Sequence, residues 1–225
     1  MDTSGTAPWS IAADLVLLAL FGFVAVQLLR TARRPRPRPW LAIAAVIVVG
    51  APSLLQYAIP GLGRALERDP TATLAHAEWW RPVTALLAQD GGLVAAAFNL
   101  VIVGAVVLVG EWSWGRARTL VAFLATSLVL NLIALTWTSR GGGSSFASDG
   151  LMVALTAHTA LTRPVAPVRV IGAVQLVIAV VLVALNDAHG LAMLVGAALG
   201  VLLALPDIAP RRGDLDASPI RKDTP

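Results

Sequence analysis

The sequence contains no cysteine and few charged residues. Without cysteine, the chain forms neither disulfides nor thiolate metal sites. Only 13% of its residues are charged, whereas 57% are hydrophobic, and the mean hydropathy is +0.76. Because a soluble domain carries about 25% charged residues, this composition excludes an ordinary soluble protein. It predicts an all-α polytopic membrane protein.

Two further absences narrow the class of membrane protein. The sequence shows no internal repeat, which argues against a transporter built from inverted halves. The apolar runs also carry no paired charges of the kind that mark ion or solute pathways. A small-solute transporter or channel is therefore disfavoured.

Long apolar runs occupy most of the chain, and a helix needs roughly 20 residues to cross about 30 Å of hydrocarbon. Seven spans are expected, near residues 10–29, 41–59, 93–110, 119–137, 148–162, 168–186 and 189–205. The first begins with acidic residues and is too long for a cleaved signal peptide, so we interpret it as a retained helix. The fifth is short, which indicates an entrance recessed among other helices.

Basic residues predict the orientation, because arginine and lysine concentrate in cytoplasmic loops. Alternate loops and the C-terminal tail hold thirteen of the seventeen basic residues: Arg30, Arg33, Arg34, Arg36, Arg38, Arg116, Arg118, Arg163, Arg169, Arg211, Arg212, Arg221 and Lys222. We expect an integral protein of the plasma membrane with a cytoplasmic C-terminus and an N-terminus outside. The excess charge indicates contact with anionic membrane lipid, and no nucleic-acid partner is expected.

A serine and a histidine are expected at the same outer depth of the membrane. Ser145 follows a glycine-rich segment before the fifth span, and His189 opens the seventh. Amide hydrolysis needs a nucleophile, a base and donors for the oxyanion. A helix N-terminus with free N–H groups favours developing negative charge, and a neutral histidine can accept the serine proton. Ser145 and His189 are therefore the candidate catalytic residues.

Other polar residues complete the candidate site or compete for a role in it. Asn99, about two turns into the third span, can donate its amide to an oxyanion, and Gly143 allows a close backbone approach two positions before Ser145. Ser148 is an alternative nucleophile, although the residue two positions before it is Phe146 and not glycine. A bulky side chain there would obstruct a close backbone approach to the substrate. No acidic residue is clearly placed as a third member, so we predict a dyad with Asp187 as the candidate to orient the histidine. No metal or cofactor is expected.

Two residue patterns bear on the bundle interior. His158 is expected roughly 15 Å or more along the fifth span from either serine, which suits a core or cavity role better than that of the base. Ala192, Gly196 and Gly200 recur every four residues on the seventh span and allow another backbone to come close. If that neighbour is the fifth span, Ser145 and His189 are brought together.

Five motifs in this order resemble those of the rhomboid family of intramembrane serine proteases, over roughly residues 41–205. They are Trp80-Arg81 with Thr84, Phe98-Asn99, Glu111 to Gly115, Gly143-Ser144-Ser145 with Gly150-Leu151, and His189 followed by Gly196 and Gly200. The resemblance implies a rhomboid-like six-helix core at residues 41–206. We also expect an extra N-terminal transmembrane helix with a basic Arg/Pro connector at residues 1–40 and a disordered cytoplasmic tail at residues 207–225.

The chain also departs from the family pattern. The family commonly has an oxyanion-binding histidine four residues before the asparagine, where this chain has Ala95. The residue after the nucleophile is often small, whereas here it is Phe146, and Ala192 replaces the first glycine after the histidine. The resemblance implies an intramembrane serine protease that hydrolyses peptide bonds in or near transmembrane segments of membrane proteins. The alternative is a catalytically inactive rhomboid-like protein that binds transmembrane helices as clients.

Overall fold

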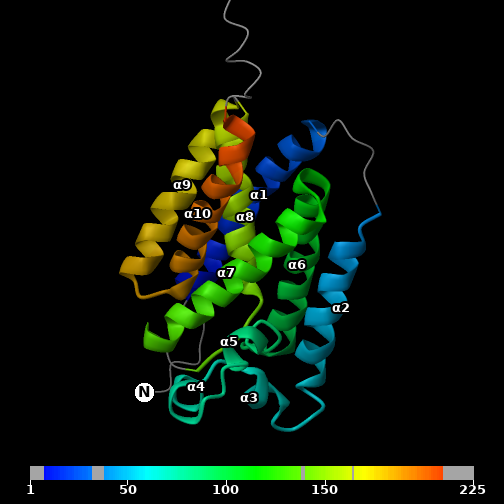
Figure 1. Ribbon diagram of the computed structural model, residues 1–225, viewed down its shortest axis with the longest axis vertical. Coiled ribbons are helices and arrows are strands. Elements are labelled where there is room, and N and C mark those ends of the chain that lie inside the picture. Colours follow the sequence, from blue (N-terminus) through cyan, green and yellow to red (C-terminus); the bar gives the residue numbers. More distant parts are fainter. Residues whose placement is uncertain (1–7, 32–37, 138–139, 164, 210–225) are drawn as a thin grey trace, which may run out of the picture.

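The computed structural model describes residues 8–31, 38–137, 140–163 and 165–209, and this part of the chain is all-helical. The long helices are α1 (Pro8–Thr31), α2 (Trp40–Leu55), α6 (Gly92–Trp114), α7 (Arg116–Trp137), α8 (Ser145–Thr162), α9 (Ala166–Ala184) and α10 (Ala188–Ile208). Three short helices, α3 (Leu62–Leu66), α4 (Pro70–His76) and α5 (Arg81–Thr84), gather at one end of the bundle (Figure 1). We call this the loop end.

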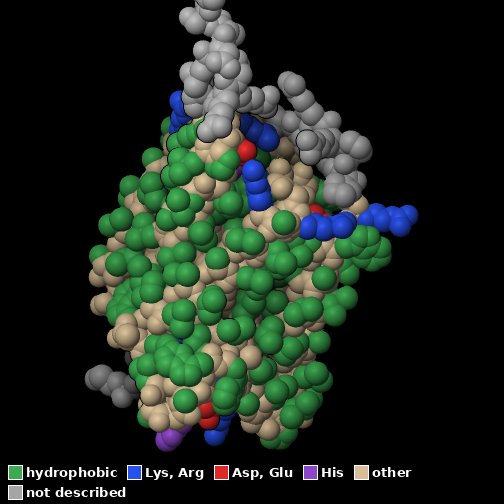
Figure 2. All heavy atoms as spheres, in the orientation of Figure 1, with side chains coloured by type: hydrophobic (Ala, Val, Ile, Leu, Met, Phe, Trp, Pro, Cys, Tyr) green, Lys and Arg blue, Asp and Glu red, His purple; other side chains and the backbone are tan. Residues whose placement is uncertain are grey.

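Four helices in the described ranges are long and apolar enough to cross a membrane: α6, α7, α9 and α10. The apolar part of α1, Leu15–Arg30, and α2 are shorter, and α8 is interrupted by polar residues. Large hydrophobic side chains stay exposed on the outer surface, with Val94 85% and Val101 71% exposed. Figure 2 shows hydrophobic side chains over the middle of the visible face, with most charged ones toward its ends. Both observations fit an α-helical membrane protein.

Helix α8 is the central helix of the bundle and is buried along most of its length. It packs against α10, α7, α9 and α6. A Cβ added at Gly196 of α10 would overlap the backbone of Gly150 on α8, and one at Gly200 would overlap that of Ala154. The sequence left the neighbour of this small-residue face open, and the structure shows that it is α8.

A buried carboxylate fixes the start of α2 against the end of α6. Glu111 Oε2 accepts hydrogen bonds from the backbone N–H groups of Leu41 and Ala42, at 3.0 and 3.1 Å. These donors belong to the first turn of α2, where a helix offers no partner of its own. Arg116 Nε donates to the other oxygen of Glu111 at 2.8 Å, so the glutamate is both paired and fully used.

Helix boundaries differ from the sequence expectation by a few residues. Helix α8 begins at Ser145 rather than near residue 148, α2 ends at Leu55 rather than near 59, and α6 continues to Trp114 rather than to 110. The Arg/Pro connector and the C-terminal tail fall mainly on residues 32–37 and 210–225, which lie outside the described residues.

Candidate functional site

The two candidate catalytic side chains lie together at the loop end of the bundle. Ser145 is the first residue of α8, and His189 is the second residue of α10. Ser145 Oγ lies 3.1 Å from His189 Nε2, which is hydrogen-bonding distance. The close packing of α8 on α10 sets this distance, because it holds the two helix starts at the same level.

Asp187 completes a series of three side chains. Nδ1 of His189 donates to Asp187 Oδ1 at 2.7 Å, and the same oxygen accepts the backbone N–H of His189 at 3.0 Å as the N-cap of α10. Because a carboxylate only accepts hydrogen bonds, this contact places a proton on Nδ1 and leaves Nε2 of a neutral ring free to accept from Ser145.

The ionised form of Asp187 is favoured where it sits. Burial alone would raise its pKa, but the hydrogen bond and charge of His189, with the backbone N–H, outweigh it and hold the pKa below its ordinary value. The preceding turn supports this arrangement, since Asn186 has a φ of 59°, a left-handed conformation that asparagine tolerates better than most residues. Asp187 is therefore a fixed negative charge behind the imidazole.

Phe146 packs against the histidine ring. Its ring centroid lies 5.0 Å from that of His189, with an edge-to-face angle of 65°, a favoured geometry for aromatic pairs. The bulky residue that departs from the family pattern thus contacts the imidazole and helps to hold it in place.

The glycine segment before Ser145 is fixed by hydrogen bonds to the loop end. Gly141 and Arg68 exchange two backbone hydrogen bonds of 2.8 and 3.1 Å. Gly142 N–H donates to Asp90 Oδ2 at 2.9 Å, and Gly143 N–H donates to Ala85 O at 2.9 Å. All three N–H groups are used, so this segment is a positioned turn rather than a free loop.

Close approach in that turn requires a glycine at residue 142. A Cβ added there would overlap the Ala88 side chain and crowd Ala85 O, whereas one at Gly143 would meet Ser145 Oγ at an ordinary 3.5 Å. Gly143 also uses its N–H on Ala85, so it supports the turn and is not a free donor for an oxyanion.

Ser148 lies one turn into α8 and is buried. Its hydroxyl donates to the backbone carbonyl of Ser144 at 3.1 Å. His189 therefore contacts the hydroxyl of Ser145 and not that of Ser148. The Ser148 hydroxyl is hydrogen-bonded within its own helix, as is common for serine.

Asn99 reaches the site through a residue that the sequence analysis did not single out. Its Nδ2 donates to Gln89 Oε1 at 2.9 Å, and Gln89 Nε2 donates to Ser144 Oγ at 3.0 Å. Gln89 is 6% exposed. One N–H of the Asn99 amide is engaged, and the second is available to a bound group. The sequence offered one weak signal for Gln89: it is a polar residue that follows an apolar run and precedes the pair Gly91-Gly92.

A polar cavity of about 290 Å³ adjoins this hydrogen-bonded chain, with Gln89, Asp90, Glu67 and Tyr57 among its lining residues. Burial raises the pKa of the Glu67 carboxyl, and the negative charge of Asp90 raises it further. A cavity with several polar groups is large enough to hold water. Gln89 links this cavity to Ser144, the residue before α8.

His158 lies near the opposite end of α8, at a distance from the serines that excludes it as their base. Its Nε2 is 2.9 Å from Asp207 Oδ2, and its ring packs edge-on against Trp114. Arg118 donates to the same carboxylate at 2.8 Å. His158 thus joins a polar cluster at the far end of the bundle. No group of three or more metal-ligating side chains occurs among the described residues.

Comparison with known proteins adds no relative. No protein-family model matches the sequence, and no curated protein sequence matches it.

Proposed function

We propose that the chain is a rhomboid-like intramembrane serine protease that cleaves peptide bonds in or beside transmembrane segments of other membrane proteins. The observation that supports it most is the hydrogen-bonded series Ser145, His189 and Asp187, with contacts of 3.1 and 2.7 Å. A serine, a histidine and an acid linked in this order are the working parts of nucleophilic amide hydrolysis on unrelated folds.

Each group has a role in the proposed reaction. Ser145 Oγ forms a bond to the carbonyl carbon while His189 Nε2 takes its proton and Asp187 stabilises the charged ring. His189 then gives that proton to the amide nitrogen as the C–N bond breaks, which leaves an acyl group on the serine. A water molecule, activated by the same histidine, hydrolyses the ester and restores Ser145.

Two groups are the candidate donors to the negative oxygen of the tetrahedral intermediate. The first N–H groups of α8 have no partner within the helix, and the helix dipole is positive at this end. The Asn99 amide retains a second N–H. A preorganised donor of this kind contributes on the order of 10²–10³ in rate, so the lack of a histidine at Ala95 predicts a slow enzyme.

The substrate is expected to approach through the lipid. A transmembrane helix must unwind locally to expose its peptide bond to Ser145, so small or helix-breaking residues are expected at the cleavage site. The site faces the outside in the orientation inferred from the basic residues.

Labelling with serine-reactive fluorophosphonates, both small and long-chain, tests the assignment in purified protein. We expect labelling of the native chain and of Ser148→Ala, and none of Ser145→Ala or His189→Ala. Loss in Ser148→Ala alone would transfer the nucleophile to Ser148, and an unchanged signal in all three variants would reject the serine-histidine site.

A catalytically inactive rhomboid-like protein that binds transmembrane helices is the second candidate. Ala95 favours it, because one expected oxyanion donor is missing, as does the engagement of Asn99 with Gln89. Failure of every fluorophosphonate to label the folded chain, together with capture of intact transmembrane peptides, would support this function over proteolysis.

A further inference from the structure

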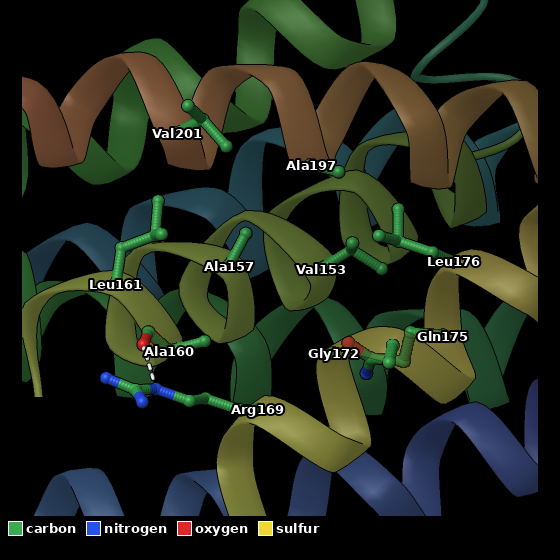
Figure 3. Close-up of a pocket in the computed structure, with 11 residues that line it drawn as sticks. Val153, Ala157, Ala160, Leu161, Arg169, Gly172, Gln175, Leu176, Ala197 and Val201 are labelled. Carbon is green, nitrogen blue, oxygen red and sulfur yellow. Dashed lines mark hydrogen bonds between the residues drawn. The ribbon is translucent and has the colours of Figure 1, made fainter. Parts of the chain in front are cut away.

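An apolar groove of about 400 Å³ lies between α8, α9 and α10, away from the serine and histidine. Figure 3 shows side chains of all three helices around it. Most of its lining is aliphatic or glycine: Val153, Ala157, Ala160, Leu161, Gly172, Ala173, Leu176, Ala197 and Val201. Its volume falls within the roughly 300–1,000 Å³ of ligand pockets in general.

The groove occupies one half of the length of the bundle. It is formed by the second half of α8 and the first half of α9, so it runs from the middle of the bundle to the end opposite the dyad. This end carries Arg118, Arg163 and Arg169 and is the cytoplasmic end in the orientation inferred above. A molecule in the groove would therefore belong to the inner leaflet.

Two polar side chains break the apolar lining. Arg169 is exposed near the start of α9, and its Nε donates to Ala160 O at 3.1 Å (Figure 3). This single contact leaves further guanidinium N–H groups for another acceptor. Arginine presents a planar fork of donors that suits phosphate.

Gln175 lies two turns deeper along α9. It is 0% exposed, and neither its amide oxygen nor its amide nitrogen has a hydrogen-bond partner within the described part of the chain. Buried polar atoms are nearly always paired, because leaving them unpaired costs free energy. An amide without partners on the wall of a groove indicates a missing ligand with a polar group at this depth.

We propose that this groove binds one anionic phospholipid of the surrounding inner leaflet. Its phosphate binds Arg169, a glycerol ester carbonyl accepts from the Gln175 amide, and an acyl chain fills the aliphatic part. The two polar side chains are six positions apart along α9, or about 9 Å at 1.5 Å per residue, so the phosphate and the ester carbonyl of one lipid can be engaged at once. The inference depends on the membrane-spanning helices and not on the proposed proteolysis.

Native mass spectrometry of the full chain, extracted from vesicles of equal parts phosphatidylglycerol and phosphatidylcholine, tests the site. We expect one retained lipid, with phosphatidylglycerol preferred about fivefold, the ratio that corresponds to the contribution of one basic residue at headgroup level. Arg169→Ala should remove this preference. Arg38→Ala is the matched control, because Arg38 is an exposed arginine at the same end of the bundle before α2, and it should keep the preference.

Two further variants probe the interior of the groove. Gly172→Leu should abolish retention of both lipids by filling the space, since a Cβ there meets only Thr156 at 3.7 Å. Gln175→Leu removes the unpaired amide. It should raise the melting temperature without lipid and reduce the rise that added phosphatidylglycerol gives.

Some outcomes would overturn the proposal. They are equal retention of both lipids by the native chain, an unchanged preference in Arg169→Ala, or full retention in Gly172→Leu that remains folded by circular dichroism. A second copy of the chain in place of the lipid mass, lost in Gly172→Leu, would replace the lipid with a protein occupant.

Discussion

At the scale of single residues, Asp187 combines a structural role with a chemical one. It caps α10 through the backbone N–H of His189 and holds Nδ1 of the same residue. Its pKa is lowered in the folded protein relative to an ordinary value of 3.8. The ionised carboxylate therefore stabilises the fold above that value. This contribution is lost as the pH falls through the lower, folded-state pKa.

Replacement of Asp187 by asparagine separates these roles. Asparagine is as good an N-cap as aspartate, so we expect little change in the melting temperature. The neutral amide no longer fixes the ring tautomer or stabilises the imidazolium, and fluorophosphonate labelling should slow by roughly 10²–10⁴-fold. Asp69→Asn is the matched control, because Asp69 caps α4 by the same type of bond. Equal rates in the two variants would show that Asp187 does not orient the histidine.

Gln89 is a second residue whose effect can be isolated. Gln89→Leu leaves the Ser144 hydroxyl and the Asn99 amide without their partner, and one buried unsatisfied group costs about 1–3 kcal/mol. We expect a lower free energy of unfolding, measured by denaturation in detergent. A double-mutant cycle with Asn99→Ala should give a coupling of about 0.5–3 kcal/mol. If the two single changes in the free energy of unfolding simply add in the double variant, the hydrogen bond between Gln89 and Asn99 does not contribute to stability.

At the scale of elements, the contact between α8 and α10 is the feature on which the site depends. Gly196→Val would place a side chain into the backbone of Gly150, and such overpacking typically costs about 1–3 kcal/mol. We expect α10 to move away from α8, so that Ser145 and His189 separate and labelling is lost. Gly22→Val on α1 is the control, since a Cβ there meets nothing within 4 Å. Normal labelling of Gly196→Val would show that this packing does not set the dyad distance.

The long helices were predictable because each corresponds to one continuous apolar run of the sequence. Expected spans and observed helices differ by a few residues at most ends. The small-residue face of α10 was also visible in the sequence, but its neighbour was not. The start of α8 was missed by three residues, because the turn before it is positioned by contacts with residues distant in the sequence. The turn before Ser145 is held by hydrogen bonds with residues more than 50 positions earlier in the sequence, namely Arg68, Gln89 and Asp90. No local pattern announces such contacts.

At the scale of the whole molecule, the structure brings the alternate basic loops to one end. Arg116 Nη2 donates to Arg38 O at 3.1 Å, and Arg118 pairs with Asp207 near the end of α10. The starts of α2 and α7 and the end of α10 therefore share one surface, which in Figure 1 lies opposite α3, α4 and α5. The loop end and the turn before α8 carry only the four remaining basic residues of the sequence, Arg64, Arg68, Arg81 and Arg140.

This asymmetry in the number of basic residues predicts the orientation, because arginine and lysine near the ends of spans are retained on the cytoplasmic side. A green fluorescent protein fused after residue 225 should fluoresce, and alkaline phosphatase inserted at Gly61 should be active, since that enzyme folds only outside the cytoplasm. Moving the reporters to the opposite positions supplies the control and should silence both. Activity of alkaline phosphatase at the C-terminus would invert the topology. The serine and histidine would then face the cytoplasm, and their substrates would have to expose the scissile bond on that side.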